Sequence, residues 1–146
     1  MDNQTIHQLT ELNRSIIQFR GLYSSWSSKH NISYNEMLVL YTIHEKSFCT
    51  QKQICDSYLL PRQTINHVIA QLRNEGILEI SREHSVGREK AFVLTEKGKC
   101  YAQPLMEAMD RFESRSVELL GHDKLEMLTT LMLEYGQALS QALQEE

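Results

Sequence analysis

The sequence predicts a mainly α-helical fold that includes one small β-hairpin. Six segments carry apolar residues at helical spacing, and two short β-rich runs flank a single glycine, Gly87. Only 2 Pro and 6 Gly occur among 146 residues, of which 41% are hydrophobic and 23% charged. This composition is typical of one globular, helix-rich domain that is long enough to bury its own core.

The first predicted helix carries a long apolar stripe, and the second begins at a capping box. The stripe recurs at spacings of three and four residues, as expected for one helix face: Leu9, Leu12, Ile16, Phe19, Tyr23 and Trp26. In "SYNE", Ser33 stands three residues before Glu36, which predicts a helix N-terminus. The inner face of this second helix is then predicted to be Met37, Leu40, Tyr41 and His44.

The next two predicted helices form a close pair. "TQKQ" repeats the capping box with Thr50 and Gln53, and Ile54, Cys55 and Tyr58 supply the inner side of a short helix. Pro61 suits the first turn of the following helix, and Gly76 ends that helix. Its inward face is predicted to be Ile65, Val68, Ile69 and Leu72.

A hairpin and two further helices complete the chain. "ILEIS" and "KAFVLT" predict two strands joined by "REHSVGRE", in which Gly87 supplies the turn. Thr95 can cap a fifth helix, and Asp123 with Glu126 in "DKLE" predicts a capping box for a sixth. The two helices carry the stripes Leu105, Met109, Phe112, Ser116, Leu119 and Leu125, Leu128, Met132, Tyr135, Leu139, Ala142.

This order of elements is that of a winged helix-turn-helix with long terminal helices. A short helix, a tight connection, an amphipathic helix and a two-stranded wing follow one another along the chain. The outer face of the helix from Pro61 to Glu75 has no carboxylate before Glu75, and carries Arg62, Gln63, Asn66, His67 and Gln71. Gln and Asn can pair with adenine edges and Arg with guanine, whereas carboxylates are repelled by phosphates. The pattern therefore predicts binding to double-stranded DNA.

The distribution of charge agrees with this interpretation only modestly. The net charge is −4, yet residues 50–100 carry eight basic and six acidic side chains, and residues 101–146 carry three and nine. The middle of the chain is the only positive part. A solvated surface of mixed charge is the commoner explanation of such an excess. A winged-helix protein-interaction module without DNA binding is therefore kept as the alternative function.

Three motifs in order resemble the MarR family of bacterial transcription regulators over nearly the whole chain. They are "ISYNEMLVLYTI", "TQKQICDSYLLPRQTINHVIAQLRNEGIL" and "GREKAFVLTEKGK". The resemblance implies that Arg88 is the wing-tip arginine, although Val86 replaces the aspartate that the family commonly has two residues earlier. It also implies that the groove-facing residues are Arg62, Gln63, Thr64, Asn66 and His67. The predicted interface is completed by Gln71, Arg82, His84, Ser85 and Lys90.

The resemblance also implies a homodimer joined through its terminal helices. We expect a single domain, 1–146, with a DNA-binding lobe at 33–98 and a helical dimerisation region at 1–30 and 99–146. The apolar stripes exceed what one small core can bury, although a monomeric bundle could also use them. The expected function is a homodimeric repressor on a palindromic, inverted-repeat operator, controlled by a phenolic or lipophilic effector. Four aromatic residues form either its pocket or simply core: Tyr23, Trp26, Tyr34 and Tyr41.

Other classes of function find little support in the sequence. The six histidines are dispersed and the spacing of Cys49 and Cys55 is not that of a zinc site, so we expect no metal and no cofactor. No nucleophile has a base and an orienting group beside it, so no enzyme is expected. Cys49 is the one candidate for a redox-active thiol, against an inert one. Without an apolar run of about 18 residues or a signal peptide, we expect a cytoplasmic protein without a membrane partner.

Overall fold

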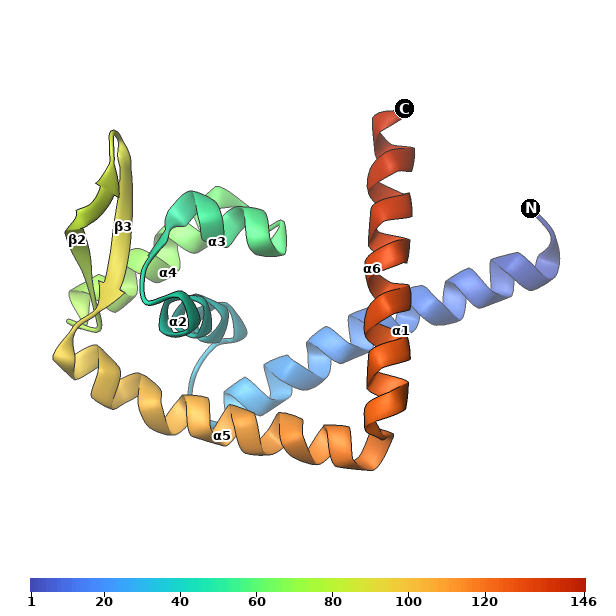
Figure 1. Cartoon of the computed structure of the whole chain (residues 1–146), viewed down its shortest axis with the longest axis horizontal. Coiled ribbons are helices and arrows are strands. Elements are labelled where there is room, and N and C mark those ends of the chain that lie inside the picture. Colours follow the sequence, from blue (N-terminus) through green and yellow to red (C-terminus); the bar gives the residue numbers. More distant parts are fainter. The chain divides into compact units, whose positions relative to one another are not determined.

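A computed structural model describes all 146 residues and contains six helices and three strands. The chain divides into two compact units, Met1–Leu105 and Met106–Glu146, which are described separately. The first unit holds the helix-turn-helix and the wing, and the second holds the end of α5 and all of α6 (Figure 1). The predicted fold class, mainly α with a small β wing, is confirmed.

Helices α1 (Asn3–Lys29) and α2 (Tyr34–Lys46) both begin at side-chain caps. The Asp2 carboxylate accepts a bond of 2.8 Å from the backbone N–H of Thr5. At α2 the predicted capping box is confirmed, because Ser33 Oγ accepts from Glu36 N at 3.2 Å and Glu36 Oε2 accepts from Ser33 N at 2.9 Å. These bonds satisfy amide groups that have no partner inside the helix.

Helix α2 is buried over more of its surface than one predicted stripe. Met37 and Leu40 are buried as predicted, but Tyr41 is 41% exposed and His44 is exposed. The remaining buried side chains are Val39, Thr42 and Ile43. The prediction for Tyr41 and His44 was wrong because α1, α4, β1 and β3 all pack on α2, so its buried side is set by several neighbours.

Helices α3 (Gln51–Tyr58) and α4 (Arg62–Asn74) form the helix-turn-helix. The Thr50–Gln53 capping box is present, with bonds of 3.1 and 2.9 Å. Pro61 stands one position before α4, and the predicted inward face of α4 is buried. Gly76, at φ 72°, ends the helix through bonds from its own N–H to Arg73 O and from Ile77 N–H to Leu72 O. This is the Schellman arrangement that glycine favours.

The wing is a three-stranded antiparallel sheet in the order β1-β3-β2. β2 (Leu78–Val86) and β3 (Glu89–Leu94) form the predicted hairpin and are joined through Gly87 at φ 58°. β2 runs further than predicted, with an irregular register between Ser81 and Val86. The strand β1 (Cys49–Thr50) was not predicted, because two residues carry no periodicity and their pairing with Phe92 and Ala91 is distant in sequence.

Helices α5 (Glu96–Leu120) and α6 (His122–Gln144) begin differently. Thr95 caps α5 as predicted, since its hydroxyl accepts from Gly98 N at 2.9 Å. The capping box predicted at Asp123 and Glu126 is wrong. α6 already begins at His122, after Gly121 at φ 97°, so Asp123 lies inside the first turn and no side chain caps the helix.

Candidate nucleic-acid interface

Helix α4 presents an exposed polar face without a carboxylate. Arg62, Gln63, Asn66 and His67 are exposed, while Thr64 is half-buried. The four inward apolar residues of α4 fix this orientation, since they hold the opposite side in the core. Further along, the amide of Gln71 donates to Glu36 at 3.3 Å and to Glu75 at 3.1 Å. Gln71 is therefore already bonded within the lobe.

The wing residues of the predicted interface divide into two groups. Arg82, Arg88 and Lys90 are exposed. His84 and Ser85 are half-buried and bonded inside the wing. The ring of His84 stacks on Phe48 at 3.9 Å, and Ser85 Oγ donates to Ser81 O at 2.6 Å while it accepts from Ala91 N at 3.0 Å. These bonds occupy the stretch where the register of β2 is irregular, so both side chains help to shape the wing.

A cationic cleft of about 240 Å³ separates α4 from the wing. Its charged lining comprises four cations and one carboxylate: Arg62, Arg73, Arg88, Lys90 and Glu89. Glu89 pairs with Arg62 at 3.8 Å, and Gln51 Nε2 donates to the Arg62 carbonyl at 3.0 Å. Arg73 was missed at the sequence level. The available signal was its spacing, because positions 62, 66 and 73 share one stripe of a helix.

The four aromatic residues predicted for an effector pocket are partly grouped. The rings of Tyr23 and Tyr34 lie 6.0 Å apart, and the Arg20 guanidinium lies 5.9 Å from the centre of the Tyr34 ring. Trp26 is buried and stacks on His30 at 4.0 Å. Tyr41 is on α2 and 41% exposed. The structure thus brings together Tyr23 and Tyr34 of this set.

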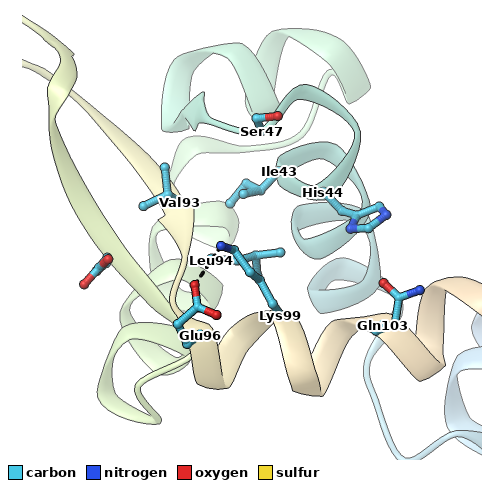
Figure 2. Close-up of a pocket in the computed structure, with 9 residues that line it drawn as sticks. Ile43, His44, Ser47, Val93, Leu94, Glu96, Lys99 and Gln103 are labelled. Carbon is cyan, nitrogen blue, oxygen red and sulfur yellow. Dashed lines mark hydrogen bonds and ion pairs between the residues drawn. The ribbon is translucent and has the colours of Figure 1, made fainter.

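A larger cavity, of about 630 Å³, opens between α2, β3 and the start of α5 (Figure 2). Ile43, Val93 and Leu94 supply its apolar part. Its polar part combines Lys99, which is paired with Glu96 at 2.8 Å, with four further side chains: His44, Ser47, Glu79 and Gln103. Sequence reasoning had assigned none of these residues to a site, because they come from four separate elements, α2, β2, β3 and α5.

The thiols and acidic groups show no arrangement for redox or metal chemistry. Cys49 is fully buried, and burial raises the pKa of its thiol; burial also raises the pKa of Cys55. Because the thiolate is the reactive form, both shifts favour inert thiols. No group of three or more His, Cys, Asp or Glu residues is arranged to hold a metal ion. No helix combines the length and apolar character needed to cross a membrane.

The fold and this surface define a winged-helix DNA-binding protein. A family model described as a winged helix DNA-binding domain matches residues 32–98. Among solved structures, NMB1585, a MarR family regulator from Neisseria meningitidis, is 28% identical, with a TM-score of 0.86 over 94% of this chain and 97% of that one. The chain therefore contains a winged helix DNA-binding domain and is similar to MarR family regulators, which supports a role as a transcription regulator.

Two further similar structures carry ligands. A MarR family regulator from Listeria monocytogenes, complexed with a 26mer DNA, is 15% identical, with a TM-score of 0.73 over 92% of this chain and 89% of that one. Staphylococcus aureus MarR, in complex with salicylate and kanamycin, is 17% identical, with a TM-score of 0.72 and 95% of each chain covered. At these identities the likeness shows the fold. A search of the curated proteins finds no match.

Proposed function

We propose that the protein is a homodimeric repressor that binds an inverted-repeat operator and is released by a small effector. The observation that carries the DNA contact is the exposed, carboxylate-free face of α4 beside the cationic wing. In this proposal Arg62, Gln63, Asn66 and His67 read base edges in the major groove. Arg88 enters the adjacent minor groove, and Arg82 and Lys90 contact phosphates.

The dimer in this proposal is joined through residues 1–30 and 99–146, while residues 33–98 form the DNA-binding lobe. Support comes from large apolar side chains that stay exposed on the terminal helices. On α1, Ile17 is 73% and Leu22 is 61% exposed; on α6, Leu133 is 65% and Leu143 is 73% exposed. Exposed apolar surface of this extent is typical of interaction sites. A two-fold dimer also explains a palindromic site, since each subunit supplies one α4.

A binding assay on the DNA upstream of the protein's own gene tests this function. We expect a protected inverted repeat whose half-sites are about 10 base pairs apart, or a multiple of one helical turn. Affinity for that site should exceed affinity for random duplex at least about 1,000-fold. A footprint over one asymmetric half-site argues against the dimeric arrangement. Equal affinity for all duplexes, or none, favours the alternative of a protein-interaction module.

For the effector we propose an aromatic acid or phenol, the class to which the salicylate bound by the S. aureus protein belongs. The Tyr23–Tyr34 pair with Arg20 nearby offers stacking and a positive charge. The cavity in Figure 2 offers apolar surface and Lys99 instead. Salicylate titrations of Tyr23→Ala and Lys99→Gln decide between them, because only the variant in the true site should lose release from DNA.

A further inference from the structure

The cleft between α4 and the wing carries more cations than the proposed base reading uses, because only Arg62 of these cations is among the base-reading residues. Four cations converge on it from three places: two from α4, one from the turn at Gly87 and one from β3. Glu89 is the only acidic side chain that lines the cleft. The buried side chains of Ile69 and Phe92 line the same cleft, so the charges stand over apolar groups and are screened less on that side. The cleft is therefore suited to an anion.

The cleft has a volume of about 240 Å³, which is room for one tetrahedral oxyanion. Arginine side chains match phosphate oxygens through paired N–H groups.

Glu89 already forms an ion pair with one of these arginines, Arg62. Its carboxylate lies 3.8 Å from the Arg62 guanidinium, and the pair is solvent-exposed, with 73% and 40% of the two side chains accessible. An exposed pair at this distance is weak. An incoming dianion can replace the Glu89 carboxylate at Arg62 without breaking any buried bond.

We propose that this cleft is a phosphate-binding site, in which Arg73 is a ligand and Glu89 is the internal carboxylate that phosphate displaces from Arg62. The phosphate belongs to the DNA backbone where the strand passes between helix and wing, or to free phosphate that competes with DNA. The DNA source rests on the proposed function above. Arg73 and Lys90 then hold the phosphate from opposite walls, and Arg73 fixes the protein on the duplex without reading sequence.

The first experiment titrates the isotope-labelled full-length protein with inorganic phosphate against chloride at constant ionic strength. Amide shifts in residues 88–90 and 73 should saturate in the parent. They should be lost in Arg73→Gln, and saturate at lower phosphate in Glu89→Gln. Arg14→Gln removes an exposed arginine outside the cleft and should match the parent. Shifts that do not saturate, or that are the same in Arg73→Gln, overturn the free-phosphate site.

The second experiment measures duplex affinity against salt for the same variants. Arg73→Gln should lower the slope of log K against log salt by about 0.9, which corresponds to about eightfold weaker binding near 0.1 M salt, equally on operator and random DNA. Glu89→Gln should bind every duplex more tightly, and more so than Glu83→Gln, which removes the same charge from β2 outside the cleft. Arg73→Lys should retain the parental slope.

The two experiments distinguish DNA phosphate from free phosphate, and they test the phosphate site separately from the proposed function. Saturable phosphate shifts with an unchanged DNA slope assign the site to free phosphate. A lowered slope without phosphate shifts assigns it to the DNA backbone. Neither response in Arg73→Gln overturns the site, while an operator that the parent still binds leaves the proposed function intact. A parent that binds no duplex overturns the proposed function, and the phosphate titration then decides the site alone.

Discussion

At the scale of single residues, Gly98 is fixed by the backbone of a distant segment. A Cβ at this position would lie 2.0 Å from the carbonyl oxygen of Ile77, which also accepts the Thr95 N–H at 3.0 Å. The close approach couples the end of α4 to the start of α5. Two further bonds cross this junction, from Thr95 Oγ1 to Gly76 O at 2.6 Å and from Lys97 Nζ to Glu75 O at 2.6 Å.

Gly98→Ala should therefore lower the free energy of unfolding by about 1 to 3 kcal/mol, because backbone must move to admit the methyl group. The matched control is Gly21→Ala in α1, where a Cβ meets nothing within 4 Å. There alanine should stabilise the helix by about 0.5 to 1 kcal/mol. Urea unfolding at one protein concentration measures both. Equal effects of the two substitutions would show that the Ile77 contact is not tight in solution.

A second prediction at this scale concerns the cysteines. Burial raises the pKa of Cys49, so less of its thiol is ionised at neutral pH, whereas Cys100 is exposed. Iodoacetamide should therefore modify Cys100 at least about ten times faster than Cys49 in the folded protein. Mass spectrometry of timed samples checks the order, and labelling in urea should remove the difference. Rapid labelling of Cys49 together with loss of DNA binding would instead support the hypothesis that Cys49 is a redox-active thiol.

At the scale of elements, removing side chains from α4 and from the wing should weaken DNA binding in different ways. Gln63→Ala and Asn66→Ala should each cost about 1 to 3 kcal/mol on the operator and little on random DNA, because base-edge contacts are lost. Arg88→Ala should weaken binding to every duplex and flatten the salt dependence. Fluorescence anisotropy with both duplexes at several salt concentrations distinguishes the patterns. Parental affinity of Arg88→Ala throughout would remove the wing from the interface.

The elements that the sequence predicted best are those specified by nearby residues. The capping boxes at Ser33 and Thr50, and the glycine end of α4, depend on residues three to five positions apart. β1 was missed because its pairing with β3 is non-local. The start of α6 was misplaced because the turn at Gly121 precedes the polar residues that looked like a cap. Helical and turn signals are local, whereas strand pairing is set by tertiary structure.

In the candidate interface, too, the features set by nearby residues could be predicted and those set by distant residues could not. The outward face of α4 follows from its inward apolar residues, so its exposed polar residues could be predicted from sequence. The cleft could not be predicted, because Arg73 and Lys90 meet across two elements and Glu89 pairs with Arg62 rather than with a wing residue. His84 and Ser85 are likewise held inside the wing, His84 by Phe48, which is distant in sequence, and Ser85 by Ala91 on β3.

At the scale of the whole molecule, the terminal helices carry the proposed assembly. Every residue of α6 is at least partly exposed in the single chain, and its predicted stripe includes Leu128 and Leu139, which are 39% and 53% exposed. Such a stripe is stable in water when a second copy covers it. The N-terminal helix contributes Phe19, which is 48% exposed. Dimerisation and operator binding are then linked, because two half-sites bound together gain affinity over one.

Deletion of residues 1–27 or 122–146 should therefore abolish dimerisation before it disturbs the wing, as sedimentation and circular dichroism would show. A point variant gives the sharper test, since Leu139→Lys places a charge on the stripe at a position that is already half-exposed in the chain. It should fold normally, sediment as a monomer and bind the operator roughly 100-fold more weakly. Gln137→Lys adds the same charge to α6 beside the stripe and should remain a dimer. A dimer that survives Leu139→Lys and both deletions would place the subunit contact elsewhere.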